Sequence, residues 1–272
     1  MRSRSTLLLV ATAATTLLTA CGGGAAELSA ADEPLRVGAS PVPHAEILRH
    51  IDEELAADAG LDLEIVEFTD YVQPNVALDD GSLDANYFQT IPYLEEQEAS
   101  AGYDFTPLAP VHIEPLGIYS SSLTDLAALP DGAMVAIPND PTNAARALRL
   151  LEANDLITLA DTGEAAPTSL DIELNPKDLQ ISEVEAAQVP RSLADVDIAV
   201  INGNYAIEAD LVPAEDSLAL EEAEGNPNAN LLVVRAGDEE DERIRQLEDL
   251  LHSDEVRQFI EQTYEGAVIP AS

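Results

Sequence analysis

The chain has 272 residues, of which 46% are hydrophobic and 24% charged, and its 12 basic and 52 acidic residues give a formal net charge of −40. An ordinary apolar content supports a folded core, so general disorder is excluded. The negative charge repels phosphate backbones and anionic lipid headgroups, which excludes nucleic-acid binding and a polybasic membrane patch. The length fits two compact lobes or one large domain.

Residues 1–20 have the pattern of a secretory signal peptide. Two arginines precede an apolar run that is too short and too rich in Ala and Thr to span a membrane. The tetrapeptide at 18–21 resembles a bacterial lipobox, so Cys21 is predicted to carry a lipid after cleavage. A buried or free thiol is the alternative. Because Cys21 is the only cysteine, no internal disulfide can form. Residues 21–34 are then expected to be a flexible tether.

The first part of the body alternates strand and helix patterns, which is typical of an α/β fold with a mainly parallel sheet. Strands are predicted at 35–39, 63–68 and 84–87, and helices at 43–60 and 74–78. Apolar residues spaced by three and four give the first helix one buried face. A long strand is expected at 111–119, and the chain is expected to cross there to a second lobe.

The second lobe is predicted to contain strands at 134–137, 179–184 and 196–201, and a helix at 144–153. Asp140 marks the start of this helix, because Asp accepts first-turn N–H groups and Pro141 follows it. A return crossover is placed near Asn202. A strand at 231–234 and helices at about 239–251 and 254–264 then complete the first lobe. The predicted division is therefore lobe 1 at 35–117 and 203–272, and lobe 2 at 118–202.

Motifs for enzymatic chemistry are absent from the sequence. There is no Gly-x-Ser-x-Gly and no Gly-x-x-x-x-Gly-Lys. The four histidines lie far apart without ligand spacing, which argues against a His-rich metal receptor. The acidic run 238–242 lacks the spaced oxygens and the glycine of a Ca²⁺ loop, so it is predicted to be a solvated helix start. No enzyme activity, metal or cofactor is predicted.

The segment 138–146 is the most informative candidate for a ligand site. A strand ends and a helix begins here, with Asn143 in the first turn and Arg146 three residues later on the same face. An amide, a guanidinium and free helix N–H groups can thus converge on an anion such as a carboxylate. The alternative is an arginine paired with a surface acid.

Aromatic and amide side chains supply further candidates. Tyr71, Phe88 and Tyr93 lie near Pro or Asn turn residues in a chain that is only 4% aromatic, as a cleft wall requires; ordinary hinge packing is the alternative. Asn202 ends one apolar strand and Asn230 precedes another, where loops can present amides to a ligand. Loop capping is the alternative for both asparagines.

Several ordered segments resemble signatures of the MetQ/NlpA family of methionine-binding lipoproteins, the receptors of methionine ABC importers. These segments are Phe68–Asn75, Asp84–Gln89, Pro92–Leu94, Pro138–Asn143, Pro190–Leu193 and Ala199–Asn202. The resemblance extends from Leu35 to the C-terminus. It implies a type 2 periplasmic-binding-protein fold, in which two α/β lobes joined by two hinge crossovers enclose an amino acid.

The resemblance also implies roles for the candidate residues. Arg146 is expected to bind the ligand carboxylate. Amides that bind the carboxylate or the ammonium are Asn143, Asn202 and Asn230, and aromatic rings that surround the thioether are Tyr71, Phe88 and Tyr93. Two positions depart from the family pattern and are candidate modifiers of the ligand pocket: Thr90 stands where His is common, and Tyr87 where the residue is often smaller. Methionine is therefore the expected ligand, with a methionine-containing dipeptide or another apolar amino acid as the alternative.

The implied partners are an ABC permease and its ATPase, and the implied location is the extracytoplasmic face of the cell membrane, with anchoring through Cys21. Two other classes remain as rivals. A lipid-anchored hydrolase requires a perturbed acid–base pair in the cleft. A surface adhesin or structural lipoprotein leaves Arg146 solvated.

Overall fold

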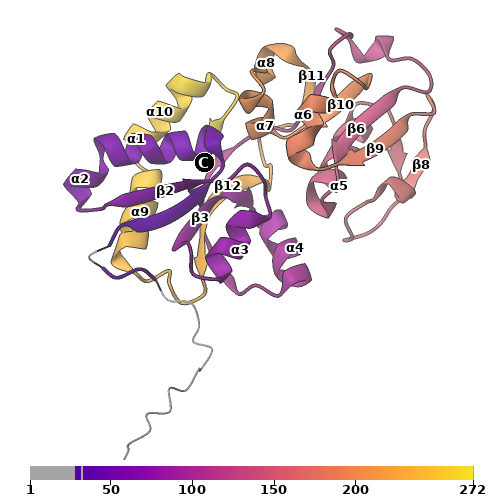
Figure 1. Ribbon diagram of the computed structural model, residues 1–272. Helices are drawn as coiled ribbons and strands as arrows, with labels where there is room; N and C mark the ends of the chain where they lie inside the picture. The colour runs from indigo at the N-terminus through magenta and orange to yellow at the C-terminus, as the bar shows by residue number, and fades with distance from the viewer. Residues whose placement is uncertain (1–27, 32, 272) are drawn as a thin grey trace, which may run out of the picture.

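The computed structural model describes residues 28–31 and 33–271, which form two α/β lobes lying side by side (Figure 1). The predicted signal peptide and Cys21 lie outside the described residues. Within the described ranges, no helix combines the length and the apolar character that crossing a membrane requires.

The first lobe contains a six-stranded sheet in the order β13-β4-β12-β3-β1-β2. Its strands are β1 (Leu35–Ala39), β2 (Leu63–Glu67), β3 (Ala85–Thr90), β4 (Phe105–Ile113), β12 (Ala229–Arg235) and β13 (Ile269–Pro270). β1 pairs in parallel with β2 and β3, whereas β12 runs antiparallel to β3 and β4, and β13 antiparallel to β4. The prediction of a mainly parallel sheet is wrong for this half, because β12 returns from the second lobe in the opposite direction.

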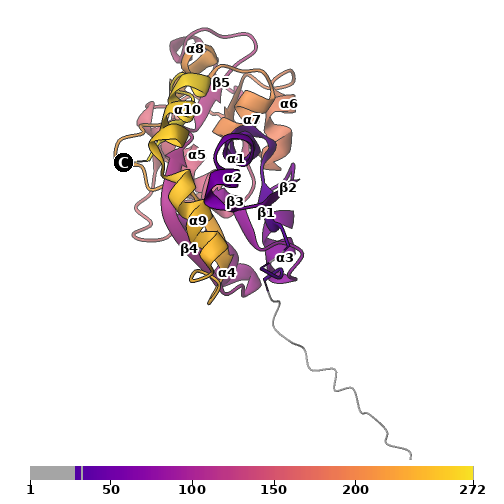
Figure 2. The same ribbon diagram turned by 90° about the vertical axis from the view of Figure 1, so that its left-hand side faces the viewer.

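Helices cover both faces of this sheet. They are the helical turn η1 (Pro41–Ala45), α1 (Glu46–Glu54), α2 (Ala56–Ala59), α3 (Gln73–Asp79), α4 (Ile91–Ala101), α9 (Glu242–Leu251) and α10 (Asp254–Tyr264). Buried residues of α1, α9 and α10 share one core with the sheet, and Figure 2 shows these helices together on that face. Leu78 of α3 and Leu94 of α4 pack in a separate core with β4 and β12. Sequence patterns did not predict α4, because few of its residues are buried.

The second lobe contains a five-stranded sheet in the order β11-β5-β10-β6-β9. Its strands are β5 (Gly117–Tyr119), β6 (Met134–Pro138), β9 (Gln180–Val184), β10 (Ile198–Ile201) and β11 (Ser217–Leu220), and a separate pair is β7 (Thr158–Leu159) with β8 (Ile172–Leu174). Its helices are α5 (Pro141–Ala153), α6 (Val189–Ser192), α7 (Gly203–Glu208) and α8 (Pro213–Asp216), with 3₁₀ turns η2 (Leu126–Ala128), η3 (Ser169–Asp171) and η4 (Ala186–Gln188). The central strands β10, β6 and β9 are parallel, while β5 is antiparallel to both of its neighbours.

The two crossovers differ from the predicted ones. The expected single strand at 111–119 is two strands in two different sheets, so the outward crossover is residues 114–116. The return crossover is residues 221–228, because β11 pairs with β5 inside the second sheet. By sheet membership the second lobe therefore spans 117–220, and the placement of the return near Asn202 is wrong. The short β11, half-buried throughout, gives no clear sequence pattern.

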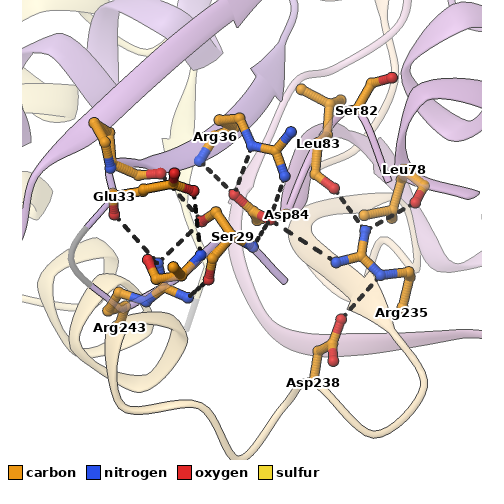
Figure 3. A network of polar contacts seen from close by, with 12 residues as sticks. Ser29, Glu33, Arg36, Leu78, Ser82, Leu83, Asp84, Arg235, Asp238 and Arg243 are labelled. Atoms are coloured by element: carbon orange, nitrogen blue, oxygen red, sulfur yellow. Dashed lines mark hydrogen bonds and ion pairs between the residues drawn. The ribbon is translucent and has the colours of Figure 1, made fainter. Parts of the chain in front are cut away.

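Part of the expected tether is fixed to the first lobe (Figure 3). The Ser29 N–H donates to Asp84 Oδ1 at 2.8 Å, and Arg243 Nη2 donates to the Ser29 carbonyl oxygen at 2.8 Å. Asp84, whose side chain is buried, also accepts from Arg36 Nη2 at 2.8 Å. The expectation of a flexible tether up to Pro34 is therefore wrong for Ser29, Ala30 and Glu33, whose carbonyl oxygens all accept from Arg243.

Candidate functional site

A cavity between the lobes brings together all seven residues that the sequence suggested for ligand binding. The space between its lining atoms is about 380 Å³ and is partly open to solvent. The predicted residues among its lining are Tyr71, Phe88, Tyr93, Asn143, Arg146, Asn202 and Asn230. The lining also includes Thr90, as expected for a pocket modifier, and His44, Gln89, Glu114, Gly203 and Asn204, which the sequence analysis did not propose.

The two lobes touch beside the cavity. Tyr71 Oη of the first lobe donates to Asn204 Oδ1 of the second at 2.6 Å. Tyr205 Oη donates in the opposite direction, to the carbonyl oxygen of Thr69 at 3.3 Å. These hydrogen bonds join the lobes directly on one side of the cavity.

An aromatic wall on the first lobe lines one side of the cavity. The ring centroids of Tyr71 and Tyr93 lie 5.9 Å apart, and each ring lies 6.0 Å from Phe88. Tyr93 belongs to the first turn of α4, whereas Phe88 belongs to β3, so the expectation that these rings lie beside turns and not in strands is wrong for Phe88. Burial raises the pKa of Tyr71 well above its usual value, so its hydroxyl stays protonated and donates. The wall presents aromatic faces suited to an apolar or sulfur-containing side chain.

The start of α5 places two polar groups at the cavity. Asp140 is the N-cap, as predicted, because its side chain accepts the Asn143 N–H at 2.9 Å. It also accepts from Asn143 Nδ2 at 3.0 Å. Asn143 Oδ1 in turn accepts from Asn202 Nδ2 at 2.8 Å. The amide of Asn202 is therefore oriented, and its buried Oδ1 has no hydrogen-bond partner in the described part of the chain.

Arg146 is buried one turn further along α5. Its Nε donates to both oxygens of Glu221, at 2.8 and 3.0 Å, and Nη2 donates to the Glu114 carbonyl oxygen at 3.0 Å. The alternative of pairing with an acid is thus partly correct, but Glu221 is mostly buried in the return crossover and is not a surface residue. No hydrogen bond within the described residues involves Nη1 of Arg146. Nη1 is therefore the guanidinium nitrogen that the described residues leave without a partner.

A buried cluster of His44, His112 and Glu114 lies at the cavity. His112 Nε2 donates to Glu114 Oε1 at 2.7 Å, and His44 Nε2 lies 3.2 Å from the same oxygen. Burial lowers the pKa of His44 to about 4 and that of His112 to about 3, so both rings are neutral at ordinary pH. Burial raises the pKa of Glu114, although His44 and Arg146 oppose the shift. The view that the histidines are scattered is therefore wrong for these two.

One donor atom from each member of this cluster lies within 4.8 Å of the others, so the three residues are able to hold a metal ion. Hydrogen bonds account for the same arrangement. His44 Nε2 also lies 3.1 Å from Asn230 Oδ1, and Tyr87 Oη bonds to His112 Nδ1. The absence of a metal from the function stays a prediction.

Tyr87, the other candidate pocket modifier, is not among the residues that line the cavity. Its side chain is fully buried behind the cavity, where its ring centroid lies 4.8 Å from that of His44. Thr90, by contrast, reaches the cavity directly.

Among the residues that sequence reasoning missed, Asn204 had a usable signal. It comes two positions after Asn202, and its buried Nδ2 has no hydrogen-bond partner within the described ranges. Gly203 between them approaches the outward crossover so closely that a Cβ atom would lie 2.8 Å from Glu114 Cβ. Glu114 carried no signal, because its neighbours in the cavity come from distant segments.

A cavity between two lobes, with an aromatic wall, an arginine edge and a buried carboxylate, defines a receptor for a small molecule that has apolar and charged parts. The family model for NlpA lipoprotein matches residues 35–272. The chain therefore belongs to the NlpA lipoprotein family, which confirms the family resemblance.

Individual relatives agree with this assignment. The chain is 40% identical over 240 residues to the methionine-binding lipoprotein MetQ of Bacillus subtilis, covering 87% of each chain. It is 41% identical over 222 residues to the D-methionine-binding lipoprotein MetQ of Escherichia coli, covering 80% of this chain and 82% of the relative. A nutrient-binding protein from Burkholderia cenocepacia, solved bound to methionine, matches with a TM-score of 0.84 and 43% identity over 88% of this chain and 100% of that chain. The predicted type 2 periplasmic-binding-protein fold is confirmed.

Proposed function

We propose that this chain is the extracytoplasmic substrate-binding lipoprotein of an ABC importer and that it binds methionine in the cavity between its lobes. One observation carries the proposal: an arginine, a buried carboxylate and an aromatic wall line the same cavity between the lobes. These groups match the carboxylate, the ammonium and the thioether side chain of methionine. The names of the relatives and the methionine-bound structure support the same ligand.

Donors in the cavity suit the ligand carboxylate. Arg146 offers Nη1, and Asn204 offers Nδ2. Asn230 Oδ1 lies against His44, so its Nδ2 is the end left for a ligand. Hydrogen bonds to a charged group each contribute about 1.5–3 kcal/mol. The carboxylate is therefore expected to hold the ligand to the second lobe through Arg146.

Acceptors in the cavity suit the ammonium. Asn202 has a buried Oδ1 without a described partner, and Glu114 supplies a carboxylate among neutral histidines. Asn143 Oδ1 has one lone pair left after accepting from Asn202. A cation placed among these three groups satisfies the unpaired acceptor and compensates the buried negative charge.

The aromatic wall favours a ligand with an apolar, sulfur-containing side chain. Burying a methionine side chain contributes about 1.5–3 kcal/mol. Each sulfur–aromatic contact adds about 0.3–1.5 kcal/mol. Thr90 also lines the cavity and is smaller than the His that the family commonly carries there. This difference supports a second candidate ligand, a methionine-containing dipeptide or another apolar amino acid.

The proposed mechanism is closure around the ligand, followed by delivery to a permease driven by its ATPase. The ligand shifts the lobes toward the closed state only because it binds that state better than the open one. Nothing in this cycle requires a cofactor or a covalent step. Lipidation at Cys21 would keep the body at the extracytoplasmic face of the membrane.

The test is calorimetry on residues 28–272, unfolded and refolded to remove any retained ligand. L-methionine is titrated beside D-methionine, leucine, glutamine and Gly-Met. Saturable binding that favours methionine and falls at least about tenfold in Arg146→Lys is expected, since lysine cannot reproduce the guanidinium geometry. Arg149→Lys, an exposed change on the same helix, is the matched control. Binding of Gly-Met or leucine in preference to methionine would transfer the assignment to the second candidate.

A further inference from the structure

Both crossovers hold Arg146. Its Nε and Nη2 atoms are occupied by Glu221 of the return crossover, and Nη2 also donates to the Glu114 carbonyl oxygen of the outward crossover. The ligand-facing guanidinium thus belongs to a helix of the second lobe but is fixed by the two segments that join the lobes.

Glu221 is itself held by the hinge. Its backbone N–H donates to the Leu116 carbonyl oxygen at 2.8 Å, and the Leu116 N–H donates to Glu221 Oε2 at 3.2 Å. Burial would raise the pKa of this carboxyl, but its bonds to Arg146 and Leu116 lower the value, so the side chain is charged at neutral pH. It does not line the ligand cavity. Glu221 therefore approaches Arg146 from the side away from the ligand.

We propose that Glu221 is a positioning residue for recognition of the ligand carboxylate. It holds the Nε and Nη2 edge of Arg146, so that Nη1 faces the cavity, and it ties that orientation to the paired crossovers of the hinge. This inference rests on the proposed function. It also explains why a nearly buried arginine is stable before a ligand arrives, because a buried charge without a partner is costly.

Loss of Glu221 should weaken the binding of ligands that carry a carboxylate more than the binding of ligands that lack one. Without Glu221, the guanidinium loses the acceptor that fixes its plane, and a planar fork that is free to rotate bonds less well to a carboxylate. A ligand without that carboxylate has nothing to lose from the rotation. Loss of Glu221 should therefore affect methionine much more than its amide.

The experiment measures the affinities of L-methionine and L-methioninamide by calorimetry in Glu221→Ala, Glu221→Gln and wild type. Glu221→Ala is expected to weaken methionine roughly tenfold or more and methioninamide less than about threefold. Glu221→Gln should fall between, since its amide oxygen still accepts one N–H group. Glu222→Gln, an exposed change at the next residue, is the control and should bind as wild type does.

Three results would overturn the inference. Equal loss for both ligands would indicate a merely structural role. Unchanged methionine binding would show that Arg146 needs no support, and tighter binding would show that Glu221 competes with the ligand. If Glu221→Ala does not refold, the Glu221→Gln comparison decides alone. Failure of wild type and Glu222→Gln to bind methionine would instead reject the proposed function, and the inference with it.

Discussion

Replacing Glu114 with glutamine tests whether a buried negative charge recognises the ligand ammonium. The substitution keeps the shape of the side chain and an acceptor for His112 and His44, but it removes the charge. Methionine binding is expected to weaken by about 2–3 kcal/mol, or roughly 30- to 150-fold. Because 4-(methylthio)butanoate has no ammonium and its carboxylate has the same charge as Glu114, its binding should not weaken.

The magnitude follows from the position of the carboxyl. Unit charges about 4 Å apart attract by about 4 kcal/mol at an effective dielectric constant near 20. The gain is smaller here, because His112 and His44 already contact the carboxyl and burial raises its pKa. Part of the attraction is therefore needed to keep the buried carboxyl ionised. The expected loss of binding free energy thus falls in the lower half of the range of about 2–5 kcal/mol for breaking a buried charge pair.

The assay is calorimetry of both ligands at several pH values, with Glu222→Gln as the control. An ammonium beside Glu114 lowers the raised pKa of this carboxyl, so the complex binds fewer protons than the free protein. Wild-type affinity should therefore rise with pH through the raised pKa, and protons should be released on binding. Glu114→Gln should abolish both effects. If Glu114→Gln binds methionine as tightly as wild type does, or if methionine and 4-(methylthio)butanoate lose the same affinity, the reasoning is refuted.

Three further outcomes are expected. Thr90→His restores the side chain common in the family and fills part of the cavity. It should therefore tighten methionine binding several-fold and weaken Gly-Met binding in the same calorimetric panel. Weaker methionine binding with tighter Gly-Met binding would show that residue 90 does not limit the size of the ligand. Asp84→Asn should lower the free energy of unfolding by about 3 kcal/mol in urea at neutral pH. Burial raises the pKa of Asp84, but bonds from Arg36 and Ser29 outweigh this effect and lower the pKa below 3.8. The stability that Asp84 contributes is therefore present above pH 3.8 and is lost as the pH falls through the pKa of the folded state. A difference in unfolding free energy between wild type and Asp84→Asn that is the same at all pH values would contradict this reasoning. Burial lowers the pKa of His44 from 6.5 to about 4, so the unfolded chain takes up a proton first, and this group should lower stability by about 3 kcal/mol as the pH drops from 6.5 to about 4. His44→Gln should remove this contribution and leave that of His112, whose pKa burial lowers to about 3, whereas the exposed His252→Gln should not change the slope.

Local chemistry explains which features the sequence could predict. The start of α5 was predictable, because Asp140 and Pro141 act within one helical turn, and their spacing places Arg146 on the same face as Asn143. The family resemblance predicted that these residues share a ligand site with the rings of the aromatic wall. The buried face of α1 followed from periodicity alone.

The rest depends on contacts between distant segments. β11 joins the second sheet through pairing with β5, about 100 residues earlier in the chain, and its four residues are all half-buried, without the alternating burial of a strand that has one core face. His44 and His112 lie far apart in sequence and meet only because η1 packs beside the end of β4. Glu221 could not be chosen among 52 acidic residues before the return crossover was placed.

The charges around the cavity explain why a zwitterion is the suitable ligand. Arg146 and Glu221 compensate one another, and the neutral His44 and His112 add no positive charge. An ionised Glu114 therefore leaves one uncompensated negative charge. A carboxylic acid without an ammonium would bring a second negative charge to the site, whereas an α-amino acid brings both signs and places its cation where the excess lies. The ammonium, more than the carboxylate, should then separate amino acids from other small acids. The carboxylate sets the orientation at Arg146, and through Glu221 this orientation is linked to the hinge.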